Sequence, residues 1–349
     1  MIGYSGPTTF PDRESIVKYL DTFRDTRLIA VDVESVSIEN MSPVGISIAV
    51  NPTEAFYFTM HPELDEEFPW ELLTNPEVVK VFHNALFDLS VLDELGLDDT
   101  NIEDTMILAR LQNLPSALNE LAALYSIEAH SMKEYLGKGQ TVLDLDPTLV
   151  ARKCCQDSMA TLRVYYEIHH EIDQDYYDVE VSLIPLLVDM SNKGLQIDQD
   201  YRERLQTKLE EDVEYFLSIC SDEGFNPSSP QQVGYTLAKR NNILPIRRRF
   251  NAKSAKWEMK IATGAEILEK SYDPLAAVIL GYRKASKLLS TYIVPLAGHP
   301  RAFTRWHTDA VTGRISSARR NLQNIPTSVR GMFIPDSGVF TDWDASQIE

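Results

Sequence analysis

The first part of the chain carries short apolar runs separated by polar turns. The runs RLIAVDVES (27–35), VGISIAV (44–50) and AFYFTM (55–60) are rich in β-branched and aromatic residues, which predicts buried strands. Farther along, the segment 147–172 carries apolar residues at helical spacing, which predicts a long amphipathic helix. Strands followed by helices predict an α/β (α+β) domain, which we place at residues 1–175.

The remainder of the chain has a different pattern. Residues 176–300 are mostly helical in periodicity, with a polar basic connection at 246–260, and residues 301–349 turn to short strands and loops. A membrane-spanning helix needs about 18 consecutive apolar residues, and no apolar stretch of the sequence approaches this length. The three cysteines, two of them adjacent, give no disulfide framework. These features predict a cytoplasmic protein that has no membrane partner.

Charge is unevenly distributed along the sequence. The formal net charge of −19 argues against a nucleic-acid partner when the chain is taken as a whole. Acidic residues are in large excess before residue 237, however, whereas basic residues are in excess after it. This distribution predicts an acidic module followed by a basic module that binds phosphate. Random variation of surface charge is the alternative interpretation.

Four acidic residues of the first domain are candidate metal ligands. Asp32 and Glu34 lie two residues apart on a predicted strand, so both side chains point to the same face. Asp88 ends the segment HNALFD, and Asp157 lies within CCQDSMAT on the long helix. Hard divalent cations prefer oxygen ligands, and a pair of such ions drives in-line attack on a phosphodiester. Taken alone, an Asp-x-Glu pair on a strand is more often a solvated pair than a site.

Taken together, the segments VDVES, HNALFD and CCQDSMAT resemble the three motifs of the DEDD 3′–5′ exonucleases that accompany family-A DNA polymerases. The resemblance implies a ribonuclease-H-like fold and two Mg²⁺ or Mn²⁺ ions, held by the four carboxylates. It also implies that Asn84 and Phe87 shape the site for the 3′-terminal nucleotide.

Lys153 departs from the pattern of that family. The family usually has a tyrosine four residues before the last aspartate, where it positions the attacking water, and Lys153 stands at this position. A lysine can hydrogen-bond the water or favour hydroxide, and it can equally weaken the reaction. We expect an active nuclease, because a chain without this chemistry has no need of four converging carboxylates.

The basic region carries a second resemblance. TGRISSARRNLQNIP (312–326) closely resembles a segment of family-A DNA polymerases, with Arg320 where the family usually has proline, and YRKASKLLSTY (282–292) resembles their thumb helix. The resemblance implies that the thumb binds duplex phosphates while the other segment lies near the primer terminus. An ordinary polar loop is the alternative for the latter. The implied thumb residues are Lys284, Lys287, Ser290, Thr291 and Tyr292, and those near the primer terminus are Arg314, Asn321, Gln323 and Asn324.

The segment DASQIE (344–349) resembles polymerase motif A, with Ala345 where the family often has tyrosine. The resemblance implies that Asp344 binds both catalytic magnesium ions and that Glu349 excludes ribonucleotides. Nucleotidyl transfer also needs a second aspartate and basic groups for the triphosphate. The sequence contains neither the fingers motif nor the His-Asp-Glu motif that supply them in the family.

Three hypotheses follow from these resemblances. In the first, residues 1–175 form the exonuclease, 176–300 a helical thumb and 301–349 an incomplete palm of a DNA polymerase of bacteriophage type. This chain would bind DNA primer-template and single-stranded 3′ ends, and a second polypeptide would carry the rest of the palm and the fingers. In the second, the chain is a free-standing 3′–5′ exonuclease. In the third, it is a non-catalytic DNA-binding assembly subunit.

Overall fold

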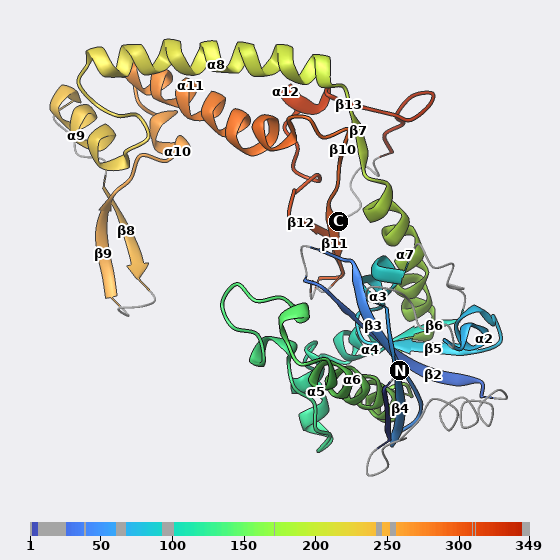
Figure 1. Cartoon of the computed structure of the whole chain (residues 1–349). Helices are drawn as coiled ribbons and strands as arrows, with labels where there is room; N and C mark the ends of the chain where they lie inside the picture. The colour runs from blue at the N-terminus through green and yellow to red at the C-terminus, as the bar shows by residue number, and fades with distance from the viewer. Residues whose placement is uncertain are drawn as a thin grey trace. The chain divides into compact units, whose positions relative to one another are not determined.

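The computed structural model describes residues 2–5, 26–37, 40–60, 68–92, 101–170, 172–241, 246–251, 256–308, 310 and 312–343. The chain divides into two compact units (Figure 1). The first comprises Met1–Lys193 with Thr304–Arg319, and the second comprises Gly194–Phe303 with Arg320–Glu349. The functional boundaries expected at residues 175 and 300 stay a prediction.

A mixed sheet lies at the centre of the first unit. In the described part of the chain it joins six strands in the order β1-β4-β3-β2-β5-β6; β2, β5 and β6 run parallel, and the other neighbours are antiparallel. The strands are β1 (Ile2–Ser5), β2 (Leu28–Ser35), β3 (Pro43–Asn51), β4 (Glu54–Thr59), β5 (Val79–Phe82) and β6 (Ile102–Asp104). The strands predicted from the three apolar runs are thereby confirmed.

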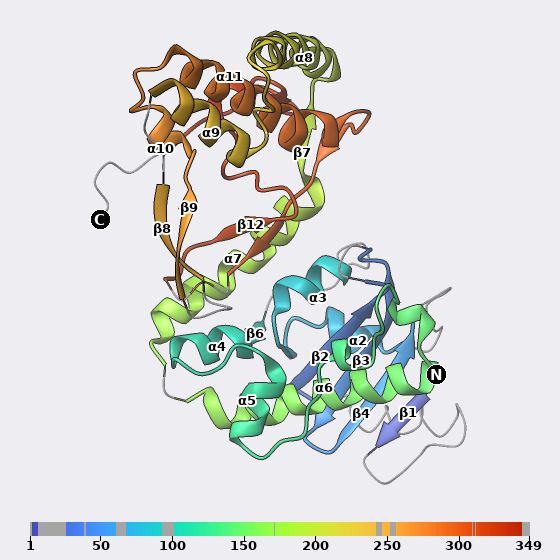
Figure 2. The ribbon, with the colours of Figure 1, turned by 90° about the vertical axis from the view of Figure 1, so that its left-hand side faces the viewer.

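Helices of the first unit cover this sheet. They are α2 (Trp70–Thr74), α3 (Ala85–Leu92), α4 (Thr105–Leu111), α5 (Leu118–Leu124), α6 (Pro147–Ile168) and α7 (Gln174–Lys193), with 3₁₀ turns at Met132–Glu134 and Val142–Asp144. Helix α6 packs across β2, β3 and β4 (Figure 2). Asp146 caps the N-terminus of α6, because its carboxylate accepts a hydrogen bond from the N–H of Thr148 at 2.7 Å, and Pro147 fits the first helical position.

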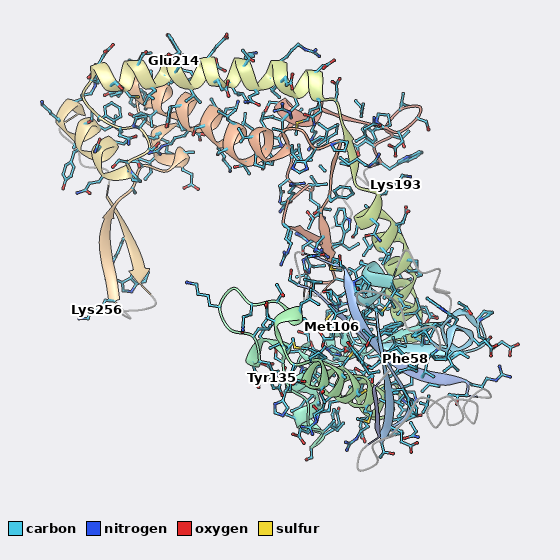
Figure 3. All side chains as sticks on the ribbon, viewed as in Figure 1. Phe58, Met106, Tyr135, Lys193, Glu214 and Lys256 are labelled. Atoms are coloured by element: carbon cyan, nitrogen blue, oxygen red, sulfur yellow. The ribbon has the colours of Figure 1, made fainter. Side chains whose placement is uncertain are left out.

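Strand β2 places two acidic side chains within the buried sheet of the first unit. Along β2, Ile29, Val31 and Val33 are buried on one side. Asp32 and Glu34 alternate with them and therefore point to the other side. Strand β4 contributes Phe56 and Phe58, both fully buried (Phe58 is labelled in Figure 3). Apolar burial on both faces of a central sheet is typical of α/β architecture.

The second unit consists mostly of helices. They are α8 (Gln199–Asp222), α9 (Pro230–Asn241), α10 (Ala265–Leu268), α11 (Pro274–Leu288) and α12 (Thr327–Arg330). Helices α8 and α11 run alongside each other (Figure 1). Gly281 permits this close approach, because a Cβ at that position would lie 2.5 Å from the Phe216 ring. Among the described residues, no helix combines the length and the apolar character needed to cross a membrane.

Short strands accompany the helices of both units. In the second unit β7 (Leu195–Ile197) lies between β10 (Arg301–Ala302) and β13 (Phe333–Ile334), while in the first unit β11 (Arg305–His307) pairs with β12 (Ser316–Ala318). The prediction of a mere connection at 246–260 is wrong, since β8 (Ile246–Asn251) and β9 (Lys256–Ile261) form an antiparallel hairpin. The mixture of basic with β-branched and aromatic residues concealed these strands.

Candidate active site

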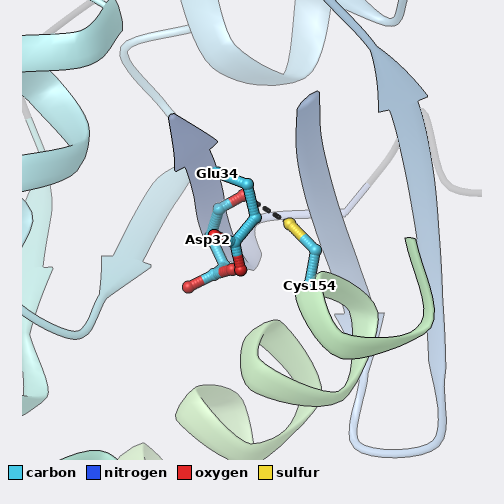
Figure 4. A group of neighbouring side chains, drawn as sticks. All are labelled: Asp32, Glu34 and Cys154. Atoms are coloured by element: carbon cyan, nitrogen blue, oxygen red, sulfur yellow. Dashed lines mark hydrogen bonds between the residues drawn. The ribbon is translucent and has the colours of Figure 1, made fainter. Parts of the chain in front are cut away.

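Strand β2 presents the acidic pair. The side chains of Asp32 and Glu34 lie on the sheet face that α6 covers. They lie next to each other, beside Cys154 (Figure 4). The ligand atoms of these three residues lie within 4.8 Å of one another. Two carboxylates at this spacing repel each other, so the arrangement favours a cation between them.

Helix α6 is fixed over the acidic pair by two hydrogen bonds. The Ser47 hydroxyl on β3 donates to the carbonyl oxygen of Cys154 at 2.8 Å, and the Cys154 thiol donates to the carbonyl oxygen of Asp32 at 3.4 Å (Figure 4). Burial raises the pKa of the Cys154 thiol well above its ordinary value. The thiol proton is engaged with the Asp32 carbonyl oxygen, and a hard divalent cation prefers the carboxylate oxygens beside it.

The same helix contributes Lys153 and Asp157 to the site. They are four residues apart, so they lie on one side of α6. The Lys153 ammonium donates to the Asp157 carboxylate, and the side chains are 2% and 15% exposed. Water is largely excluded from this ion pair, so its two charges attract each other more strongly than they would at the surface.

Helix α3 contributes the fourth carboxylate. Strand β5 pairs with Leu28, Ile29 and Ala30 of β2, and farther along β2 the N–H of Val33 donates to the Asp88 carboxylate at 3.0 Å. Asp88 thus extends from α3 to the same end of β2 that carries the acidic pair. The structure therefore brings together the four carboxylates that the sequence singled out.

Asp104 at the end of β6 holds the start of α3 in place, a role that the sequence analysis missed. Its buried carboxylate accepts hydrogen bonds from the N–H of Ala85 at 2.7 Å and of Asn84 at 3.3 Å. It also caps α4 by accepting from Met106 at 2.7 Å. The Asp-Thr sequence at the head of a helix is a recognisable N-cap signal, but its second partner is not visible in the sequence.

Asn84 and Phe87 flank this turn. Asn84 has a left-handed backbone with φ of 75°, a conformation that asparagine tolerates better than most residues. Phe87 is partly buried against the core of the first unit, and its N–H donates to the Asn84 carbonyl oxygen. Their contact with a terminal nucleotide stays a prediction.

Burial raises the pKa of all four carboxylates, and repulsion by neighbouring carboxylates adds to the rise in three of them. The pKa of Asp32 is raised by burial, with the Lys153 ammonium opposing. The pKa values of Glu34 and Asp88 are raised well above their ordinary values, first by burial and then by the charge of Asp32. Burial and then Asp32 raise the pKa of Asp157 to about 7. Such a cluster gains free energy when a cation replaces the protons.

Two oxygen atoms of the cluster are free to bind a cation. Oδ2 of Asp32 and Oδ1 of Asp157 are buried, and within the described residues neither makes a hydrogen bond. A buried carboxylate oxygen without a partner is costly. Oxygen atoms of this kind suit Mg²⁺ or Mn²⁺, so the donor set fits a divalent cation.

The expected thumb residues lie on the second unit, around the end of α11. Lys284 and Lys287 are exposed on this helix, and Ser290 and Thr291 are exposed on the π-helical turn η4 (Leu289–Ile293) that follows it. A 3₁₀ turn, η5 (Val294–Leu296), completes the segment. π-Helical turns occur frequently at functional sites, so this one deserves a test by mutation.

Three of the expected primer-terminus residues lie in one turn of the second unit, next to the thumb residue Tyr292. The Tyr292 hydroxyl donates to the Asn324 carbonyl oxygen at 3.2 Å, and the Asn324 N–H donates to the Asn321 side chain at 3.0 Å. Gln323 lies in the same turn, whereas Arg314 belongs to the first unit. Asp344 and Glu349 lie outside the described residues.

Comparison with known proteins identifies both parts of the chain. Residues 8–173 match the family model for 3′–5′ exonuclease, and residues 196–349 match that for DNA polymerase family A. The chain carries a 3′–5′ exonuclease domain followed by part of a family A DNA polymerase domain. The expected family and fold class are thereby confirmed.

Several bacterial DNA polymerases I are similar to this family A chain. It is 30% identical over 385 residues to DNA polymerase I of Chloroflexus aurantiacus and 30% identical over 389 residues to that of a Synechocystis species. Each alignment covers 98% of this chain, but only 40% and 38% of the respective relative. The chain thus spans about two fifths of the length of these relatives, and they lend no support to the expected bacteriophage origin.

A solved structure resembles the family A chain as well. The polymerase domain of Pol1 from M. smegmatis, in complex with DNA primer-template and dNTP, has a TM-score of 0.67 and 19% identity to it. The match covers 91% of this chain and 56% of that chain. At this identity the likeness supports the fold.

Proposed function

We propose that the first unit removes nucleotides from DNA 3′ ends and that the second unit binds primer-template DNA, as parts of a replicative family A DNA polymerase. The observation that carries the proposal is that β2, α3 and α6 bring Asp32, Glu34, Asp88 and Asp157 to the same end of β2, where Asp88 and Asp157 each interact with Asp32. The match of residues 8–173 to the exonuclease family supports it.

The reaction is hydrolysis of the last phosphodiester of a strand. A water oxygen attacks the phosphorus, the bond from phosphorus to the 3′ oxygen of the preceding nucleotide breaks, and a nucleoside 5′-monophosphate leaves. The attacking water loses a proton to solvent, and the leaving 3′ oxygen takes up a proton from solvent, so that the shortened strand ends in a 3′ hydroxyl. Mg²⁺ or Mn²⁺ held by the four carboxylates would lower the pKa of water and neutralise charge on the phosphate.

The residues of this chain orient the reactants. Asp88 and Asp157 approach β2 from two different helices, so a cation held at Asp32 would bring a scissile phosphate close to both. The Lys153 ammonium has three donor positions and can bind a phosphate oxygen or the attacking water. This is the proposed role of Lys153 at the position where the family usually has tyrosine.

DNA synthesis is the finer part of the proposal. Asp344 would supply one ligand for the ions of nucleotidyl transfer, and Glu349 would act on the sugar of the incoming nucleotide. The second carboxylate and the basic groups for the triphosphate belong to the rest of the palm and the fingers. We propose that these come from further sequence of the family, joined to this chain or on a second polypeptide.

The exonuclease is tested with a labelled DNA 3′ end. The full chain should release the label with Mg²⁺ or Mn²⁺. Asp32→Ala should lower the rate by at least about 100-fold, because the cation loses the carboxylate that binds it together with the other three. Glu167→Ala is the control, since Glu167 is exposed on the same helix α6. DNA binding without release of label would favour an assembly subunit instead. Release without synthesis after addition of the missing palm and fingers would favour a free-standing exonuclease.

A further inference from the structure

Lys153 places a cation inside the acidic site. Its side chain is 2% exposed, and its ammonium is paired with the Asp157 carboxylate. The negative charges of Asp157, Asp32 and Glu34 all stabilise the ammonium. Three of the four carboxylates therefore share a positive charge that belongs to the chain itself.

The fourth carboxylate is in a different environment. Asp88 is held by the N–H of Val33, and the neighbouring charges that act on it most strongly are those of Asp32 and Asp104, both acidic. The site thus has two sides that meet at Asp32. The ammonium pairs with Asp157 and acts on Glu34, whereas the neighbouring charges that act on Asp88 are those of carboxyl groups.

A divalent ion on the side of Glu34 and Asp157 would have to displace this ammonium. The two cations would share the same carboxylates at close range and repel each other strongly where water is excluded. Two buried oxygens of the site lack a hydrogen bond within the described residues, Oδ1 of Asp157 and Oδ2 of Asp32. The ammonium already pairs with the Asp157 carboxylate, so the Asp32 oxygen is the one left for a divalent ion shared with Asp88. The two positions therefore differ sharply in their affinity for a metal.

We propose that the Lys153 ammonium takes the place of one divalent ion, so that the exonuclease site binds a single Mg²⁺ or Mn²⁺ between Asp32 and Asp88. This inference rests on the proposed exonuclease function and differs from the two ions that the family resemblance implies. Lys153 would then be a built-in counter-ion that holds Asp157 and leaves the remaining ion to Asp32 and Asp88.

The ion count can be measured without any turnover. Mn²⁺ is titrated into the full chain, and bound Mn²⁺ is followed by electron paramagnetic resonance. The double variant Asp32→Ala/Asp88→Ala is subtracted as background for sites elsewhere. The wild type should bind one Mn²⁺ in this site, without the spectrum of two spin-coupled ions. Lys153→Met, which is similar in length and uncharged, should bind two and show that coupling.

A charge-retaining variant separates the role of the ammonium from that of packing. Lys153→Arg should keep the count at one, and thermal unfolding should show that both variants are folded. Two coupled Mn²⁺ ions in the wild type, or a count that stays at one in folded Lys153→Met, would overturn the inference. A chain that releases no label from DNA but shows the expected counts would contradict the proposed function alone.

Discussion

Replacing Asp104 with alanine removes the acceptor that two helix starts share. The Asp104 carboxylate accepts short hydrogen bonds from the N–H groups of Ala85 and Met106, each at 2.7 Å, and longer ones from Asn84 and Ile107, at 3.3 and 3.2 Å. Asp104 is 1% exposed, so water cannot easily take over. The variant is therefore expected to destabilise the fold and to loosen α3, which carries Asp88.

The magnitude follows from the two short bonds. A buried N–H left without a partner costs about 1–3 kcal/mol. Removal of the carboxylate also relieves the cost of burying a charge. The loss of stability should therefore fall in the lower part of the range expected for two unpartnered N–H groups. We expect the free energy of unfolding of the first unit to decrease by about 2–4 kcal/mol.

Urea unfolding followed by circular dichroism measures this loss, with Asp146→Ala as the matched control. Asp146 is also an aspartate N-cap, but it is exposed and accepts one 2.7 Å bond, from Thr148. Its replacement should cost only about 1 kcal/mol. Asp104→Ala should in addition reduce kcat for 3′-end removal more than it changes KM, because Asp88 is displaced. Equal losses of stability in the two variants, or an unchanged kcat, would refute the reasoning.

Three further predictions concern the helices, the titration of the site and the thumb. Gly281→Ala should lower the melting temperature, although alanine ordinarily favours a helix by about 1 kcal/mol over glycine, because the new Cβ would lie 2.5 Å from the Phe216 ring; the double variant with Phe216→Leu should recover the loss, and a stabilised single variant would contradict this packing. Asp157 has a pKa raised from 3.8 to about 7, so the folded state binds more protons than the unfolded state between these values. Without divalent cations, thermal stability should therefore fall as pH rises through that window, and less so in Asp157→Asn; a rising stability in both would show the sign to be wrong. Lys284→Ala/Lys287→Ala should weaken duplex binding and reduce the salt dependence of log Kd by about 2, whereas the exposed Lys208→Ala on α8 should change neither; an unaltered slope in a fluorescence anisotropy titration would remove these lysines from the interface.

Strand periodicity made the acidic pair predictable. Side chains two residues apart on a strand share a face, so Asp32 and Glu34 follow from the run of buried residues around them. The helical spacing of α6 likewise placed Lys153 and Asp157 on one side. What the sequence did not reveal is the burial of that pair, since it depends on how α6 packs against β2 and β3.

The contribution of Asp104 was hidden for a similar reason. Its cap on α4 is local and could have been recognised, but its bond to Ala85 requires β5 and β6 to be neighbours in the sheet. The hairpin of β8 and β9 was missed because its strands mix basic and apolar residues, which obscures the two-residue period. A contact between distant segments thus hid the second role of Asp104, and local composition hid the hairpin.

Identification of the first product released from a labelled DNA strand tests the account most directly. A single-stranded oligonucleotide labelled on its 3′-terminal nucleotide is incubated with the full chain and Mn²⁺. The labelled nucleoside 5′-monophosphate should appear first, and it should disappear with chelator and in Asp88→Ala. Label that stays on the strand, although the protein is folded and binds both DNA and Mn²⁺, would contradict the claim that these four carboxylates form an exonuclease site.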